Sequence, residues 1–228
     1  MSHTIRIGRP LAAAILATLL ALGCAPSTPP PLEQSVFVWQ YAWTPAVEDA
    51  LRQAAPEMDR FMVLAAEVQA KDADPPLQIR HAKVQWNVFA GLDIPVTAVF
   101  RIEASFGKRF KDDPGEAAEA LAKLTRETLD AARNAGAKAD QVQWDYDCPT
   151  AALGDYAALL ERLRPQLPGT GFSITALPTW LGNASCGKLL KTVDRYTLQA
   201  HSVGKIGKSE DTTTLCDTEK IDGWAARA

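Results

Sequence analysis

Cysteine and histidine are scarce in this chain of 228 residues, which contains four cysteines and three histidines. His3, His81 and His201 lie far apart, and no Cys/His cluster has the spacing of zinc ligands. No expected strand is followed by the glycine-rich loop that a dinucleotide or P-loop site requires. The sequence therefore predicts no metal site and no cofactor.

An excess of one charge is also missing. The chain has 24 Lys and Arg against 27 Asp and Glu, a formal net charge of -3, and the two signs are mixed along it. A nucleic-acid-binding protein usually carries a basic stripe, so nucleic acid is not an expected partner. Hydrophobic residues make up 47% of the chain, which is enough for a sizeable core.

Long hydrophobic runs are absent apart from residues 11–22, which follow Arg6 and Arg9. A run of this length is too short to span a bilayer but suits the apolar region of a signal peptide. Gly23 and Cys24 come next, and the pattern resembles a bacterial lipobox, in which the cysteine is acylated and becomes the mature N-terminus.

The lipobox resemblance implies a lipoprotein signal peptide over residues 1–23 and lipidation at Cys24. Ala21 stands where the lipobox usually has leucine, and the alternative is an ordinary secretory signal cleaved nearby. The expected location is the cell envelope, lipid-anchored on the periplasmic side of a membrane, or secreted. The proline-rich residues 24–34 favour an extended conformation and are expected to tether a folded domain, residues 35–228.

Three cysteines remain in the expected domain: Cys148, Cys186 and Cys216. An exported location permits disulfides, so one bridge and one leftover thiol are expected, and the spacing does not choose among the pairings. Cys148 has no evident base partner that would make it a reactive thiol. A disulfide is therefore the preferred interpretation for it.

Strands alternate with helices along the expected domain, which predicts an α/β fold with a mostly parallel sheet. Residues 81–91 are expected to form an added or edge strand. Polar side chains gather at the carboxyl ends of the strands, where TIM barrels build their active sites. The core strands are expected near 36–43, 60–69, 95–103, 141–147, 172–177 and 195–203.

A (β/α) TIM-barrel-like fold is therefore predicted, with about six of the eight strand–helix units of a closed barrel. Either the barrel is incomplete, through a C-terminal truncation, or the fold is open. The clearest helix begins at the capping sequence Asp113-Pro114-Gly115-Glu116 and ends at Gly136. Thr44 and Thr150 are expected to cap two further helices.

The stretch "QVQWDYD" (141–147) places Gln143, Asp145 and Asp147 on one face of a strand, with Trp144 and Tyr146 on the other. The aromatic side chains suit packing against helices, so the carboxylates are expected to face the barrel interior. Burying two aspartates is costly unless neighbours donate hydrogen bonds or one carboxylate stays protonated. The alternative is a polar strand end that supports neighbouring loops.

The segment "ADQVQWDYDCP" (139–149) resembles the fourth-strand signature of chitinase-like glycoside hydrolases of family eighteen. Asp140, Gln143, Asp145, Asp147 and Pro149 occupy its matching positions. The resemblance implies that Asp147 is the general acid and that Asp145 orients a substrate acetamido group. Asp147 is one methylene shorter than the glutamate of that signature, and Gln143 replaces an aspartate.

Other polar candidates come from neighbouring strands. Arg101 and Glu103 either form an internal ion pair or supply a second catalytic carboxylate in Glu103. Arg101 opposite Asp145 is expected to hold that aspartate ionised. Gln199 and His201 share a face of the sixth strand, where they either bind sugar hydroxyls or serve the structure.

Aromatic candidates follow the same strand ends. Trp43 and Trp180 come after strands, where exposed indoles stack on the apolar face of a sugar ring. Trp39 and Tyr41 are expected to pack in the core or against helices.

A second resemblance covers nearly all of the expected domain. The segments "VFVWQYAW", "VTAVFRIE", "VQWDYDCPT", "YAALLERLR", "SITALPTWL" and "VDRYTLQAHSV" are similar in order and spacing to a bacterial exported family, domain of unknown function family 3142. That family implies a barrel-like fold outside the cytoplasm and carries no established activity. Its members tend to be longer than this chain.

Together these patterns predict a lipid-anchored, glycoside-hydrolase-like barrel that acts on or binds a polysaccharide or aminosugar glycan. The alternatives are a non-catalytic glycan- or envelope-binding barrel and a truncated, inactive remnant. The catalytic candidates are Asp147, Asp145 and Glu103. The expected substrate-binding residues are Gln143, Arg101, Trp43, Trp180, Gln199 and His201.

Overall fold

The computed structural model describes residues 32–70, 77–201, 216 and 218–227. The expected signal peptide, the lipidation site Cys24 and residues 24–31 of the expected tether lie outside the described residues. Every helix in the described ranges is too short or too polar to cross a bilayer.

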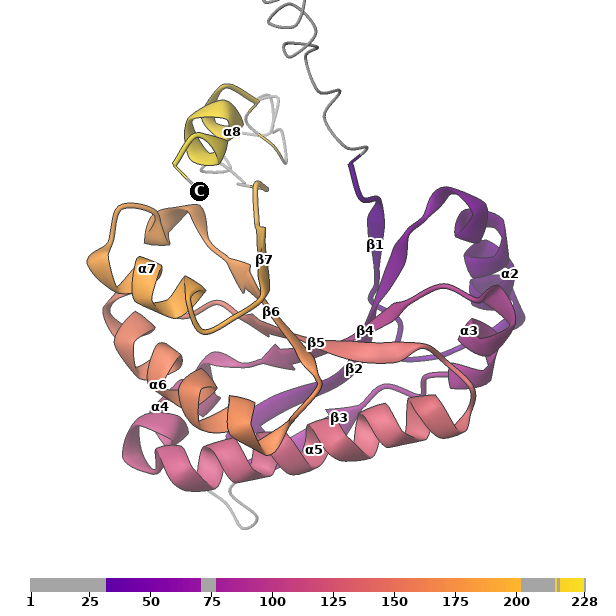
Figure 1. The fold of residues 1–228 in the computed structure, drawn as a ribbon, viewed down its shortest axis with the longest axis horizontal. Coiled ribbons are helices and arrows are strands. Elements are labelled where there is room, and N and C mark those ends of the chain that lie inside the picture. The colour runs from indigo at the N-terminus through magenta and orange to yellow at the C-terminus, as the bar shows by residue number, and fades with distance from the viewer. Residues whose placement is uncertain (1–31, 71–76, 202–215, 217, 228) are drawn as a thin grey trace, which may run out of the picture. The chain divides into compact units, whose positions relative to one another are not determined.

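A curled sheet forms the centre of the unit Glu33–Ala228 (Figure 1). Six of its strands run parallel, in the order β1-β2-β4-β5-β6-β7. The six core strands expected from the sequence are confirmed, although the first and the last are shorter than predicted. They are β1 (Ser35–Val38), β2 (Arg60–Ala70), β4 (Val96–Ile102), β5 (Ala139–Tyr146), β6 (Gly171–Ala176) and β7 (Arg195–Leu198).

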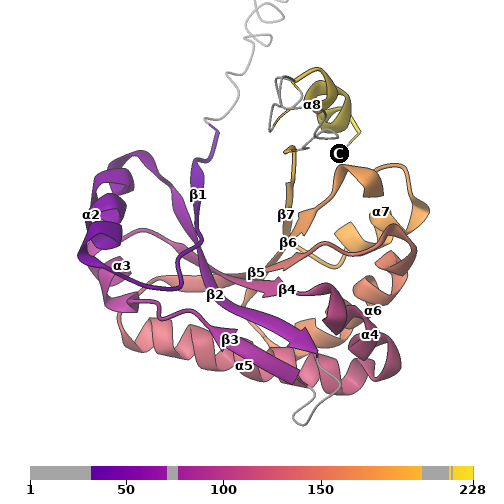
Figure 2. The same cartoon turned by 180° about the vertical axis from the view of Figure 1, so that it is seen from behind.

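Helices follow the strands and cover the outer, convex side of the sheet, as the two opposite views show (Figures 1 and 2). In the described residues β1 and β7 are the two ends of the parallel sheet, which is therefore a six-stranded half-barrel of the TIM type. The helices are α2 (Pro45–Ala54), α3 (Trp86–Leu92), α4 (Ala104–Asp112), α5 (Pro114–Asn134), α6 (Leu153–Leu163), α7 (Ala184–Leu190) and α8 (Thr218–Ala225).

The strand expected over residues 81–91 is wrong. The added strand is β3 (Leu77–His81), antiparallel to β2, and most of the following segment is the helix α3. Trp86 and Phe89 lie three residues apart with ring centroids 6.2 Å apart, which is a helical contact. The aromatic and β-branched residues that imitate a strand pattern here are buried by packing one helix face on the core.

Helix starts agree with the sequence in two cases and differ in one. Asp113 caps α5, and its Oδ1 accepts a hydrogen bond from the Glu116 backbone amide at 2.9 Å. Thr44 precedes α2 with Pro45 at the first position, although its side chain makes no capping bond. Thr150 is not a helix cap, because a 3₁₀ turn (Thr150–Ala152) intervenes and α6 begins only at Leu153.

Strand β5 has the two faces that its sequence predicted. On the convex side Trp144 stacks on Phe100 with centroids 5.2 Å apart, and Tyr146 meets Phe110 and Tyr156 edge-on. Gln143 and Asp145 alternate with these rings and point to the concave side, as Asp147 does beyond the strand end. Apolar packing against the outer helices thus fixes which face of β5 carries the carboxylates.

The predicted disulfide is not formed. The structure shows free thiols at Cys148, Cys186 and Cys216. Cys148 is buried behind β5, where its Sγ lies 3.4 Å from the Pro149 carbonyl oxygen, whereas Cys216 is exposed. Burial raises the pKa of the Cys148 thiol to about 12. A thiol held in its protonated form is a poor nucleophile, in agreement with the absence of a base partner.

Candidate functional site

A cleft of about 430 Å³ lies on the concave side of the half-barrel, at the carboxyl ends of the strands. It contains both aspartates of the stretch 141–147, together with side chains from four other parallel strands or the residues after them. Parallel strands bring their carboxyl ends to the same edge, which explains why distant residues meet here. The lining residues are Phe37, Trp39, Arg101, Asp145, Asp147, Thr175, Thr197, Leu198, Gln199, Ala200 and His201.

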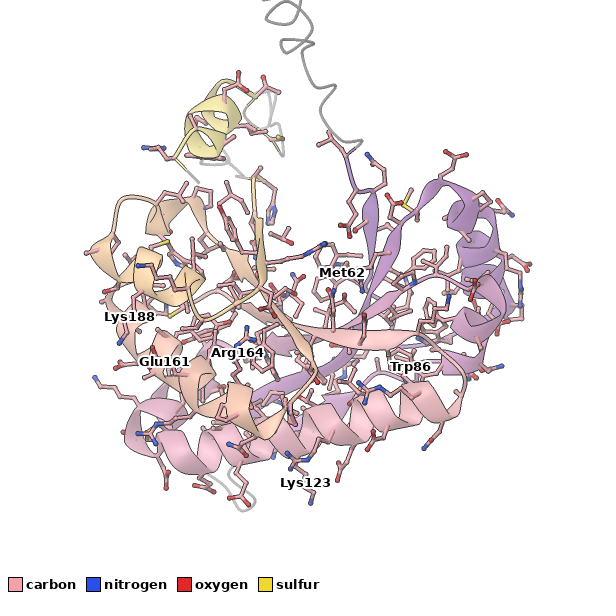
Figure 3. All side chains as sticks on the ribbon, viewed as in Figure 1. Met62, Trp86, Lys123, Glu161, Arg164 and Lys188 are labelled. Atoms are coloured by element: carbon pink, nitrogen blue, oxygen red, sulfur yellow. The ribbon has the colours of Figure 1, made fainter. Side chains whose placement is uncertain are left out.

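A larger hollow, about 510 Å³, lies between α6 and α7 in the outer helical layer. Glu161, Arg164 and Lys188, three of its lining residues, are labelled in Figure 3 on the helical side of the sheet. The Arg164 guanidinium is already bound to the Thr192 carbonyl and the Asp194 carboxylate. The concave cleft, with its convergent acids, is therefore the candidate site.

Asp145 lies at the centre of the cleft and is only 8% exposed. Thr175 on the adjacent strand donates its hydroxyl to Asp145 Oδ1 at 2.8 Å, and Gln199 Nε2 donates to the same oxygen at 3.4 Å. Arg101 Nη1 lies 3.8 Å from the other oxygen, Oδ2. Neighbours therefore satisfy the buried carboxyl group, as the sequence predicted.

Burial raises the pKa of Asp145 above its usual value. The hydrogen bond from Thr175 and the charge of Arg101 lower it by less, and the negative charges of Asp147 and Glu103 raise it further. Arg101 therefore favours the ionised form of Asp145, as expected, but lowers its pKa by less than burial raises it. A guanidinium at 3.8 Å, itself half-exposed, does not offset the loss of hydration around the carboxylate.

Asp147 follows β5 and is exposed at the mouth of the cleft. Gln199 Nε2 lies 3.4 Å from its Oδ1, so one amide group contacts both aspartates. Gln199 comes just after β7, where its backbone amide donates to the Ala176 carbonyl and continues the parallel pairing. His201 also lines the cleft; it is exposed and pairs with Cys216 in an isolated antiparallel bridge.

Arg101 and Glu103 form the ion pair that the sequence analysis weighed, with Nε 3.4 Å from Oε1. Arg101 lines the cleft, whereas Glu103 is not among the residues that do. Glu103 acts on Asp145 only as a nearby negative charge. The structure thus brings Asp145 and Asp147 together and leaves Glu103 outside their cavity, bound to Arg101.

The two tryptophans expected to stack on a sugar do not reach the cleft. Trp180 is 0% exposed, and its Nε1 donates to the Cys148 carbonyl at 2.9 Å behind the site. Trp43 is half-buried and packs edge-on against Phe89 of α3, with centroids 5.5 Å apart. Both indoles pack in or against the core instead, because the chain turns toward the helices immediately after each strand.

Trp39, which was expected to pack in the core or against helices, is the indole that lines the cleft. It is 41% exposed and stacks on Phe37 with centroids 5.6 Å apart and planes 3° from parallel. Phe37 on β1 and Trp39 just after it are two positions apart, so both rings lie on the concave side. Thr175 was also missed, although its position on the strand next to Asp145 made it the natural hydrogen-bond donor.

In the described part of the chain, no group of three or more His, Cys, Asp or Glu side chains is arranged to hold a metal ion. Gln143, the remaining site candidate, is 0% exposed and lies on the concave face below Asp145, outside the lining of the cleft.

An Asp145→Asn variant is expected to be more stable than the parent chain at neutral pH. The folded pKa of Asp145 lies above its usual 3.8, so the unfolded chain releases this proton first as pH rises, and ionisation then disfavours the folded state. Below about pH 3.8 both states are protonated and the gain disappears. The difference between the urea unfolding midpoints of the variant and the parent chain, taken at pH 7 and at pH 4, measures this gain in stability.

The control for that variant is Asp130→Asn on the outer helix α5, where the side chain is 66% exposed. Its unfolding midpoint is expected to move little at either pH. A stabilisation by Asp145→Asn that is equal at pH 7 and pH 4, or absent at both, would contradict burial as the cause of the raised pKa.

The fold and the cleft define a (β/α) half-barrel of the TIM type with two carboxyl groups at the carboxyl ends of its strands. The chain belongs to the family described as domain of unknown function (DUF3142), whose model matches residues 94–228. A search among proteins with curated descriptions finds no match to this sequence.

Solved structures with a similar fold include a spore cortex-lytic enzyme and chitinases. The chain is 13% identical to the spore cortex-lytic enzyme SleL of Bacillus megaterium QM B1551, with a TM-score of 0.64 over 86% of this chain and 47% of that one. A chitinase from Bacteroides thetaiotaomicron gives 11% identity and a TM-score of 0.62, over 86% and 62% of the chains.

A third similar structure is a complex with an oligosaccharide. It is the group II chitinase catalytic domain 2 of Ostrinia furnacalis in complex with penta-N-acetylchitooctaose, 10% identical, with a TM-score of 0.52 over 86% of this chain and 60% of that one. The chain thus spans less than two thirds of the length of these three structures. At such identities the similarity shows the fold.

Proposed function

We propose that the concave cleft binds an aminosugar-containing glycan and that the chain is a glycoside hydrolase with Asp147 as its general acid. The observation that carries this proposal is the pair Asp145 and Asp147, held by one amide group of Gln199 in a cleft with an exposed indole. The proposal also draws on the resemblance of this segment to the chitinase-like signature.

The two carboxyl groups have different surroundings, which gives them different roles. Asp147 is exposed at the mouth, where it reaches the oxygen of a glycosidic bond laid across the cleft and protonates it. Asp145 is buried beneath Asp147, and burial raises its pKa, so it is placed to orient the acetamido group of a bound aminosugar. Thr175 and Gln199 hold Asp145 in place.

Trp39 supplies the apolar contact that a sugar ring requires. The flat, partly exposed indole lies on the cleft wall with Phe37 stacked against it, so its orientation is fixed before a ligand arrives. The axial C–H faces of a sugar pack on such a ring. Arg101 and His201 add hydrogen-bond donors at the same mouth.

Two features favour a second function, glycan binding without turnover. Gln143 is an amide where the chitinase-like signature has an aspartate, and Asp147 has a shorter side chain than the glutamate of that signature. Under either function we propose that the chain acts in the cell envelope, as a lipoprotein anchored through Cys24.

The test is binding and hydrolysis of N-acetylchitooligosaccharides, aryl glycosides and cell-wall glycans. Calorimetric binding to a chitooligosaccharide and release of reducing ends are expected for the parent chain. Trp39→Ala is expected to weaken binding by about 2- to 12-fold, from the 0.5–1.5 kcal/mol of an aromatic stack. Ile79→Ala, an exposed apolar residue on β3, is the matched control and should bind normally.

Binding without turnover would select the non-catalytic function. Absence of binding to every glycan in the panel, or equal binding by the parent chain and Trp39→Ala, would overturn the assignment of the cleft.

A further inference from the structure

A second hollow, about 300 Å³, lies on the same concave face toward the amino ends of the strands. Phe37 and Thr197 line both this hollow and the cleft, so the two spaces adjoin. Met62, which lines the hollow, is labelled in Figure 3 between β1 and β7, on the open side of the sheet. The lining residues are Glu33, Ser35, Phe37, Arg60, Met62, Gln141, Gln143, Ser173, Arg195, Tyr196 and Thr197.

Two arginines of this hollow converge on one carboxylate of the chain itself. Arg195 Nη1 on β7 donates to Glu33 Oε2 at 2.5 Å, and Arg60 Nε on β2 lies 3.7 Å from Glu33 Oε1. Arg60 also contacts the exposed Asp140 and the Thr97 hydroxyl, each at 3.3 Å. The lining thus carries the positive charges of Arg60 and Arg195 and the negative charge of Glu33, and Asp140 adds a second negative charge beside Arg60.

Two donors in the wall of this hollow have no hydrogen-bond acceptor among the described residues. They are Gln143 Nε2, on a side chain that is 0% exposed, and Arg60 Nε, on a side chain that is 12% exposed. Buried polar groups are nearly always paired, and the exceptions call for a specific explanation. Both residues line the same hollow, and the nearest acceptor to Arg60 Nε is the Glu33 carboxylate, at 3.7 Å.

We propose that this hollow is a second binding site and that it takes the carboxylate of an acidic sugar. A carboxylate offers two oxygens with about four acceptor positions, which matches the converging guanidinium and amide donors. The Glu33 carboxylate occupies part of the site. Both arginines contact it, which shows that they can bind a carboxylate here.

Sugar recognition rests on two further features of the wall. Thr197 and Ser173 supply hydroxyl groups beside the charged donors, and the hollow adjoins the cleft that holds Trp39. The inference does not require the chain to be a hydrolase, because binding at the second hollow uses neither Asp147 nor Asp145.

The experiment is calorimetric titration of the chain with D-glucuronate, D-glucose and acetate. Glucuronate is expected to bind more tightly than glucose or acetate, since it alone carries both the carboxylate and the hydroxyls. Glu33→Gln is expected to strengthen glucuronate binding by about tenfold, because the amide releases the arginines from a competing charge. A gain in affinity cannot come from misfolding.

Arg195→Gln is expected to weaken glucuronate binding by about tenfold or more, and Lys188→Gln, which removes an exposed cation from α7, should leave it unchanged. Equal binding of glucuronate and glucose, or no response to both Glu33→Gln and Arg195→Gln, would overturn the site. Acetate that binds as tightly as glucuronate would overturn the assignment to a sugar. Neither result bears on chitooligosaccharide binding in the cleft, so the two proposals fail separately.

Discussion

Replacing Asp147 with asparagine is expected to lower the hydrolysis of an aminosugar glycan by about 10²- to 10⁴-fold, the usual contribution of a general acid. Asparagine has the same shape and keeps an oxygen that accepts from Gln199 Nε2, now 3.4 Å from the carboxylate. It cannot protonate a leaving group. Affinity for the glycan is therefore expected to change little while turnover falls.

Initial rates of reducing-end release measure turnover, and calorimetric titration measures affinity. Comparing them separates a loss of catalysis from a loss of binding. Asp130→Asn on the outer face of α5 is the matched control, because it removes the same charge from a 66% exposed position outside the cleft. Turnover by Asp147→Asn at the parental rate would show that another group is the acid.

Replacing Trp180 with alanine is expected to destabilise the fold by about 3–5 kcal/mol, the usual cost of removing a buried aromatic side chain. The indole is 0% exposed, and its Nε1 donates to the Cys148 carbonyl. The variant therefore creates a cavity and also leaves a buried acceptor unpaired. Urea unfolding of the parent chain and the variant measures the loss.

Trp39→Ala is the control for size and chemistry, since it removes the same ring from a 41% exposed position. Its effect is expected on ligand affinity, with a small change in the free energy of unfolding. The opposite result, a stable Trp180→Ala chain with weakened glycan binding, would restore Trp180 as a sugar platform and contradict its burial.

Residues that follow strands were the hardest to place from the sequence. Trp43 and Trp180 each come after a strand, as a sugar platform would, but the chain turns at those points and carries both rings into the core. Trp39 was assigned to the core and lies in the cleft. Period-two alternation says which residues share a face of β1, but not which face is covered.

Helices close to aromatic residues were missed for a related reason. The sequence analysis did not predict α4, although Phe106 and Phe110 are four residues apart and their rings are in contact, 5.9 Å between centroids. In α3, a contact between Trp86 and Phe89 likewise shows helical spacing. Short apolar segments fit both the helical and the strand periodicity, and only packing against the sheet decides between a helix and a strand.

The sequence by itself determined the strand–helix alternation, the cap at Asp113 and the separation of Asp145 and Asp147 from Trp144 and Tyr146. These features are local, since they depend on periodicity and on hydrogen bonds between near neighbours.

Only the tertiary structure decided the direction of the Asp145 pKa shift, the role of Gln199 and the meeting of Glu33 with Arg195. Burial sets the first, and it depends on side chains from β4, β6 and the residue after β7. The other two join residues 52 or more positions apart, because the curled parallel sheet places strand ends from the whole domain around one space.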